Sequence, residues 1–326
     1  MKSLFYKVIL PFSLTTIFLF QSLKNVRFDI FLNYLESLSL IKIVIPIIVL
    51  FIDHSLRVFR WEIILSCKNE FLRFRDCFKP YFISLFLNNI IPMRSGDIYR
   101  SFYFKNKNLK ILTSEVVGSL LIERFFDFLI ISIFFCIGYL NLIKNGYSFE
   151  TNTRFENLFF LFLIISFIII FTYIFRYPIY KFLYRIPSFR NLFDRILLAF
   201  NNIFNLIISL KKNKKLLSVF LLSLISWSLE GMYFLRILNG DAKYFFNWFG
   251  SWFVMSFATL STLIPSSPGY IGTFHFFTIK GLEAYGLPTN MASNYSFMIH
   301  ASLWLPLTLF GLILFSIDRL KVKKNN

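Results

Sequence analysis

Apolar runs recur along the whole chain and are separated by short basic loops. A helix needs about 20 mostly apolar residues to cross the hydrocarbon of a bilayer. On this criterion the pattern predicts crossings near residues 6–22, 39–59, 113–141, 157–175, 216–237 and 295–317. The runs 244–263 and 270–286 are either two further crossings or the two halves of a re-entrant element, and their lengths favour two crossings and a total of about eight.

The apolar run 80–91 is too short to cross a bilayer comfortably, and basic residues lie on both sides of it, beginning with Lys79 and Arg94. A re-entrant hairpin that enters and leaves by the cytoplasmic face accounts for both facts. The predicted fold is therefore all-α: a polytopic helical membrane protein with one or two re-entrant helical hairpins around a polar cavity.

Composition supports a single integral membrane domain over residues 1–326, because 56% of the residues are hydrophobic. The net charge of +18 comes from basic residues in the short loops, which indicates membrane topology rather than nucleic-acid binding. Loops rich in Lys and Arg stay on the cytoplasmic side of a membrane. We therefore expect a multi-pass protein of the cell (inner or plasma) membrane with both termini cytoplasmic. The most basic loop, about 176–215, contains the apolar spacing of an amphipathic helix.

Two stretches interrupt helices within apolar sequence, at residues 88–100 and 264–275. Irregular backbone is tolerated in a bilayer only where protein or a water-filled cavity surrounds it. We therefore expect both stretches to line a cavity, through Asn89, Pro92, Gly96, Pro265, Pro268, Gly269, Gly272 and His275. His275 is either a titrating group there or a buried histidine whose hydrogen bonds are satisfied.

Charged residues inside apolar spans usually face the interior of a helical bundle, because exposure to lipid is costly. The intramembrane charge cluster is predicted to comprise Glu115, Glu123, Asp127 and Glu230. The residues expected to bind a lipid headgroup are Arg57, Arg60, Arg94, Asp97, Arg100 and Arg124. Two alternatives remain open: internal ion pairs that fix helix packing, and arginines that extend toward the inner membrane surface.

The sequence contains none of the common motifs for metal or nucleotide binding. The three cysteines have no CxxC spacing, and there is no Walker A, GxGxxG or HExxH motif. We therefore expect no cofactor, no metal and no catalytic residue.

Four motifs in order resemble the transmembrane region of the lysylphosphatidylglycerol synthase family, a flippase-like group of integral membrane proteins. They are Arg60-Trp61, the turn from Ile91 to Arg100, the cluster from Glu123 to Asp127, and the segment from Pro265 to Gly272. The resemblance implies a helical bundle with re-entrant elements around a cavity, and a role in moving or presenting polar lipids. The chain differs from the family in having His275 where a Glu is common. It also has no segment matching the soluble aminoacyl-transferase domain, so we do not expect it to make lysylphosphatidylglycerol itself.

The leading functional hypothesis is a translocase, rather than an enzyme, that flips a polar or anionic lipid or lipid-linked precursor. A membrane glycosyl- or headgroup transferase, or its accessory subunit, is the first alternative, with Asp97, Glu123 or Asp127 as base. An ion-coupled transporter of small solutes is the second, with Asp53, Glu115 and Glu230 as candidate proton sites. The expected partners are membrane lipids and a lipid-modifying or glycosyltransferase enzyme, not nucleic acid.

Overall fold

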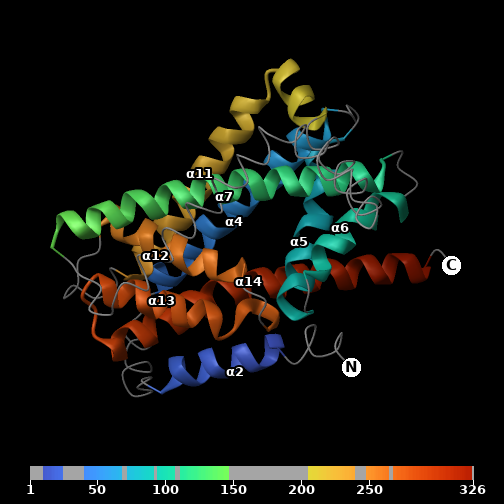
Figure 1. The fold of residues 1–326 in the computed structure, drawn as a ribbon. Helices are drawn as coiled ribbons and strands as arrows, with labels where there is room; N and C mark the ends of the chain where they lie inside the picture. Colours follow the sequence, from blue (N-terminus) through green and yellow to red (C-terminus); the bar gives the residue numbers. More distant parts are fainter. Residues whose placement is uncertain are drawn as a thin grey trace, which may run out of the picture.

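The computed structural model describes residues 10–24, 40–67, 72–91, 94–106, 111–146, 205–238, 247–263 and 267–324. This part of the chain is helical, and its elements pack into one bundle (Figure 1). The longer helices are α2 (Leu10–Leu23), α4 (Leu40–Leu65), α7 (Thr113–Lys144), α11 (Leu216–Leu238) and α14 (Thr289–Lys324). They match the predicted crossings 6–22, 39–59, 113–141, 216–237 and 295–317, whereas the predicted crossing 157–175 lies outside the described residues.

Two of the described helices, Leu216–Leu238 and Thr289–Asp318, are long and apolar enough to cross a membrane by length and composition. At 1.5 Å per residue, the 26 residues of α4 and the 32 residues of α7 also exceed the roughly 30 Å thickness of hydrocarbon.

A first helical hairpin is formed by α5 (Phe74–Ile90) and α6 (Ser95–Asn106). The two helices are antiparallel: Ser95 contacts Leu87, and Arg100 lies over the ring of Tyr81, 5.1 Å from its centroid. Helix α5 also packs against α14, where Lys79 pairs with Asp318. The open end of this hairpin therefore lies beside the C-terminal part of α14.

A second helical hairpin is formed by α12 (Trp248–Leu260) and α13 (Thr273–Ala284), which are joined through two short 3₁₀ turns, η3 (Ser261–Leu263) and η4 (Pro268–Tyr270). Phe257 contacts Phe277 and Phe253 contacts Tyr285, so the two helices are also antiparallel. Their 13 and 12 residues correspond to about 20 and 18 Å, well short of a full crossing.

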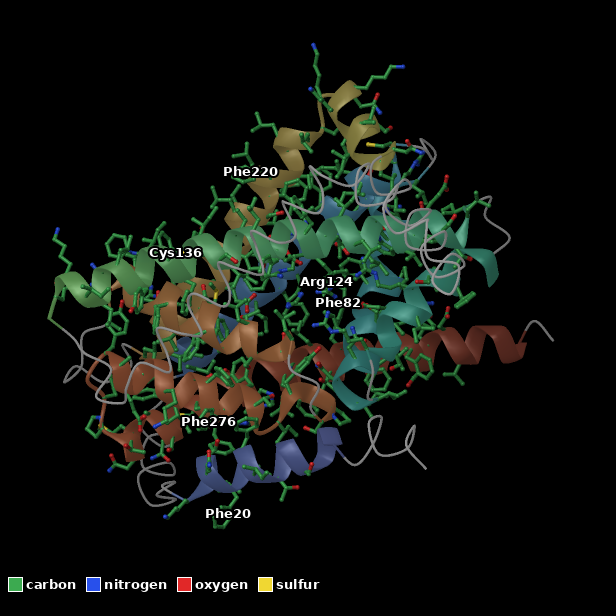
Figure 2. The ribbon with its side chains drawn as sticks, viewed as in Figure 1. Phe20, Phe82, Arg124, Cys136, Phe220 and Phe276 are labelled. Atoms are coloured by element: carbon green, nitrogen blue, oxygen red, sulfur yellow. The ribbon has the colours of Figure 1, made fainter. Side chains whose placement is uncertain are left out.

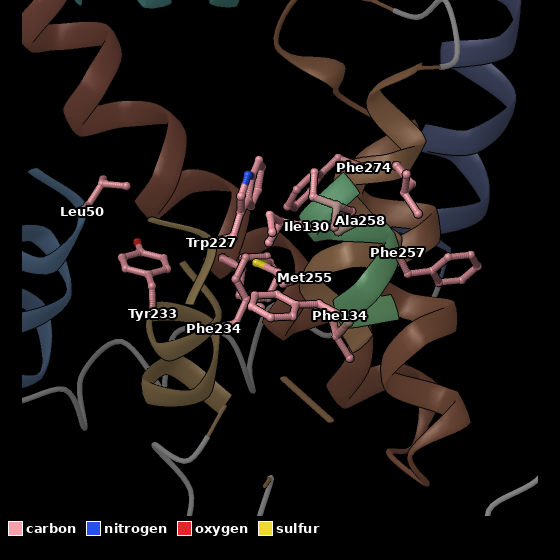
Figure 3. Close-up of a cluster of buried hydrophobic side chains, with 14 of the residues drawn as sticks. Leu50, Ile130, Phe134, Trp227, Tyr233, Phe234, Met255, Phe257, Ala258 and Phe274 are labelled. Carbon is pink, nitrogen blue, oxygen red and sulfur yellow. The ribbon is translucent and has the colours of Figure 1, made fainter. Parts of the chain in front are cut away.

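The helices are held together by one large cluster of buried aromatic and aliphatic side chains drawn from most of the bundle (Figure 3). Phe134 of α7 stacks on Trp252 of α12, with ring centroids 4.4 Å apart. A smaller cluster joins Leu206 and Leu210 to Ile64 of α4 and Ile122 of α7. Residues 205–212, the described end of the predicted amphipathic segment, are therefore a helix that packs on the bundle.

Candidate functional site where the two hairpins meet

The closed ends of the two hairpins, here called the hairpin tips, lie against each other. A Cβ added to Gly269, in the second tip, would come within 3.3 Å of the carbonyl oxygen of Asn89, in the first. The Arg94 guanidinium lies 3.5 Å from the carbonyl oxygen of Thr262. The two helix interruptions, about 170 residues apart in sequence, thus form one region (Figure 1).

Side-chain hydrogen bonds build the first tip. The backbone N–H of Gly96 donates to Asn88 Oδ1 at 2.8 Å, and the Ser95 hydroxyl donates to the carbonyl of Leu87 at 3.2 Å. A Cβ on Gly96 would come within 1.9 Å of the Ser84 carbonyl oxygen, so only glycine permits this approach of α6 to α5. Arg94 has a positive φ of 50°, which is uncommon for a residue other than glycine.

The second tip is anchored to α14. His300 Nε2 donates to the Gly269 carbonyl at 2.7 Å, which places its proton on that nitrogen if the ring is neutral. His275 is buried, and its Nδ1 accepts the backbone N–H of Gly272 at 3.2 Å. This geometry favours the interpretation of His275 as a satisfied buried histidine. The other predicted interruption residues, Pro92 and Pro265, lie outside the described residues.

Three charged groups lie at the first tip. Arg124 of α7 reaches Asp97 of α6 at 3.3 Å, and the side chains of the pair are 47% and 20% exposed. Figure 2 shows Arg124 in the central part of the molecule. For Arg94, no carboxylate of the described residues lies within the 4.0 Å of an ion pair. The tip region therefore has one arginine with no ion-pair partner in the described structure and one in a long, partly exposed ion pair.

The remaining predicted arginines are buried and paired with carboxylates. Arg57 contacts Asp53 at 3.0 Å and Glu230 at 2.6 Å. Arg60 contacts Asp127 at 2.7 Å and Glu123 at 3.8 Å. We call this set, completed by Arg100, the interior network: Asp53, Arg57, Arg60, Arg100, Glu123, Asp127 and Glu230.

Arg100 connects the interior network to the first hairpin. It contacts Glu123 at 2.9 Å, and its guanidinium stacks 3.8 Å from the ring centroid of Trp61. The indole N–H of Trp61 in turn donates to Ser119 at 2.9 Å. Of the six predicted headgroup contacts, Arg57, Arg60 and Arg100 are therefore engaged inside the bundle, whereas Arg94, Asp97 and Arg124 remain at the tips.

The structure divides the predicted charge cluster. Glu123, Asp127 and Glu230 belong to the interior network, but Glu115 lies at the start of α7, where its carboxylate accepts the N–H of Leu112 at 3.4 Å. Arg124 makes its ion pair with Asp97 rather than with its helical neighbours Glu123 and Asp127.

Several neutral residues of the site are not singled out by the sequence pattern. Trp227 donates to Asp127 at 2.9 Å and covers Arg57 at 4.1 Å, and Ser223 accepts from Arg60 at 2.8 Å. Tyr270, with a positive φ of 58°, lies within electrostatic reach of Arg124. An isolated serine, tyrosine or tryptophan in an apolar span carries no charge signal, so only its tertiary contacts identify it.

Metal binding finds no support in the described part of the chain, where no group of three or more His, Cys, Asp or Glu side chains is arranged to hold an ion. The arrangement that does stand out is a pair of basic residues beside the backbone groups of two interrupted helices. Such groups bind anions, since guanidinium donates to phosphate oxygens and the first turn of a helix offers free N–H groups.

Comparison with known proteins agrees with this architecture. Residues 8–311 match the family described as the lysylphosphatidylglycerol synthase TM region. A UPF0104 membrane protein of Methanocaldococcus jannaschii is 28% identical over 247 residues, which cover 74% of this chain and 97% of that protein. No solved structure matches significantly. The chain therefore belongs to the lysylphosphatidylglycerol synthase transmembrane-region family and is a multi-pass helical membrane protein.

Proposed function

We propose that the protein binds the charged headgroup of an anionic lipid, or of a lipid-linked precursor, at the hairpin tips and moves it across the membrane. The observation that carries this proposal is the meeting of the two tips beside Arg94 and Arg124. Among the described residues Arg94 has no carboxylate partner, and an apolar bundle has no packing reason to place such a cation there, because it is costly away from water.

The contrast with the interior network supports the assignment to these two arginines. Arg57, Arg60 and Arg100 are at most 9% exposed and paired with carboxylates at 3.0 Å or less. A headgroup could reach them only by breaking buried ion pairs. At Arg124 it would exchange a partly exposed 3.3 Å contact with Asp97 for a charge-assisted contact with phosphate.

We propose that the end of the bundle where α5 and α11 begin faces the cytoplasm. Lys215 contacts Ser66 there at 3.1 Å, and Lys79 pairs with Asp318. Basic residues gather at this end, including Arg73, Arg75, Lys79, Lys211, Lys212, Lys214 and Lys215. In this orientation the first hairpin enters from the cytoplasm and the second from the opposite side, and both are re-entrant.

The experiment is lipid movement in liposomes that contain the purified protein. Headgroup-labelled anionic, zwitterionic and polyprenyl-phosphate lipids are compared, with Arg94→Ala and Arg124→Ala beside wild type. Arg236→Ala is the matched control, because Arg236 is an exposed arginine on α11 outside the tips.

We expect anionic lipids to move fastest, and both tip variants to slow them at least tenfold while Arg236→Ala behaves as wild type. Equal rates in all variants would contradict the assignment. Formation of a modified lipid from an added donor, instead of movement, would favour the transferase alternative.

A further inference from the structure

The interior network contains more negative than positive groups. Its cations are Arg57, Arg60 and Arg100, and its carboxylates are Asp53, Glu123, Asp127 and Glu230. With every group ionised, three positive charges face four negative ones inside a membrane bundle. An uncompensated buried charge is strongly unfavourable, and a carboxylate avoids this cost by taking up a proton.

The contacts show where the excess charge lies. Asp127 has Arg60 at 2.7 Å and the Trp227 indole N–H at 2.9 Å, and Glu123 has Arg100 at 2.9 Å. Each of these carboxylates thus has a cation of its own. Asp53 and Glu230 instead share Arg57.

The two carboxylates at Arg57 differ in their hydrogen bonds and in their exposure. Both oxygens of Asp53 accept from Arg57 Nε at 3.0 Å, whereas a single oxygen of Glu230 accepts from Nη2 at 2.6 Å. The side chain of Asp53 is 2% exposed and that of Glu230 is 15% exposed. Glu230 therefore has an oxygen that is not bound to Arg57 and is the more accessible carboxylate of the two.

The cations around this pair are each bound to another group, and Arg124 of α7, which lies within electrostatic reach of Asp127, is paired with Asp97 at 3.3 Å. Helix α4 presents Arg60, which is bound to Asp127 of α7, and His54, which contacts the Tyr81 hydroxyl of α5 at 3.0 Å. Helix α14 also packs on α11, and its His300 is bound to the Gly269 carbonyl at the second tip. Helix α12 has no charged residue.

Ser226 adds a neutral hydroxyl to the surroundings of Asp53. Its hydroxyl is fully buried on α11, faces Asp53 and has no other hydrogen-bond partner in the described structure. The oxygens of Asp53, Glu230 and Ser226 are too few to hold a metal cation such as sodium or calcium. Calcium, for example, needs about six oxygen ligands. A proton needs only one acceptor.

We propose that Asp53, Arg57 and Glu230 form a proton-binding site in which the two carboxylates hold one proton between them. The proton comes from water and adds to a carboxylate oxygen, and the interior network then becomes neutral. Loss of the proton returns one negative charge to the bundle.

This site also predicts proton coupling of lipid movement, a step that rests on the proposed function. Arg124 lies within electrostatic reach of Glu123 and Asp127, so an anion bound at the tips senses the charge of the interior network. A protonated network repels that anion less than a deprotonated one. By linkage, headgroup binding and proton uptake favour each other to the same extent.

The test of the site is infrared spectroscopy of the full chain in lipid nanodiscs, titrated from acid to alkaline pH without added substrate. We expect the C=O stretch of one protonated carboxyl in wild type at neutral pH. The band should be lost in Glu230→Gln and in Asp53→Asn, because each removes one carboxylate and leaves the interior network neutral without a bound proton. Glu62→Gln, which removes a carboxylate of α4 outside the interior network, is the control and retains the band. Glu230→Gln leaves Arg57 paired with Asp53, so it is expected to fold.

A wild-type spectrum without such a band, or a band unchanged in Glu230→Gln, would overturn the proton site. A liposome assay with an imposed pH gradient then tests the coupling. We expect the gradient to change the rate of anionic-lipid movement at least threefold in wild type and not in Glu230→Gln. If the protein moves no lipid, the proposed function fails while the infrared result still decides the proton site.

Discussion

Substitution of Gly96 by alanine tests the geometry of the first hairpin directly. The new Cβ would lie 1.9 Å from the Ser84 carbonyl oxygen, 2.6 Å from the Ser84 carbonyl carbon and 2.8 Å from Asn88 Oδ1. Two of these atoms belong to the backbone of α5, which cannot rotate away as a side chain can. Relief therefore requires α6 to move away from α5 by about 1 Å, since real Cβ contacts stay beyond about 3 Å.

The cost follows from what this movement disrupts. Overpacking of this kind typically costs about 1–3 kcal/mol. The Gly96-to-Asn88 and Ser95-to-Leu87 hydrogen bonds would also weaken, at roughly 0.6 kcal/mol each for a bond inside a membrane protein. Alanine returns about 0.5–1 kcal/mol through its better helix propensity. We expect a net destabilisation of about 1–3 kcal/mol.

Gly281 provides the matched control, because it lies in a helix of the other hairpin. A Cβ there would meet its nearest neighbours, in Phe257 and Val254, at 3.5 Å, which is ordinary van der Waals contact. Gly281→Ala is therefore expected to be neutral or stabilising. Thermal melting of both variants in the same detergent provides the comparison. A Gly96→Ala protein that melts at or above Gly281→Ala would refute the described approach of α6 to α5.

Two further predictions concern the ion pairs and the orientation of the bundle. Arg60→Met leaves the buried carboxylate of Asp127 without its cation and is expected to destabilise the protein by about 3–5 kcal/mol. Arg124→Gln removes a partly exposed pair and should cost about 1 kcal/mol or less, so similar melting temperatures for the two variants would contradict this ranking. The orientation is tested with single cysteines, Lys212→Cys and Lys144→Cys, in a background without native cysteines. In intact cells a membrane-impermeant maleimide should label Lys144→Cys and leave Lys212→Cys unlabelled. Labelling of both from outside would exclude the proposed orientation.

Much of the helical framework follows from local sequence. The length and hydropathy of the apolar runs predict α4, α7, α11 and α14 to within a few residues at most ends, because a crossing helix must satisfy its backbone internally and cover itself with apolar side chains. The interruption within residues 88–100 is also visible, since Pro92 has no backbone N–H to donate and Gly96 permits a close backbone approach. The lengths of the apolar runs favoured two crossings within residues 244–286, whereas the helices found there, α12 and α13, span only about 20 and 18 Å.

The charged residues show most clearly what the sequence by itself determines and what the tertiary structure decides. The sequence places five arginines and several carboxylates in apolar surroundings, and the cost of burying charge requires that they find partners or water. It does not say which arginine pairs with which carboxylate, because partners such as Arg57 and Glu230 lie 173 residues apart. Only the packing of α4, α7 and α11 places Arg57 and Arg60 among carboxylates, and only the meeting of the two hairpins leaves Arg94 without one among the residues that the structure describes.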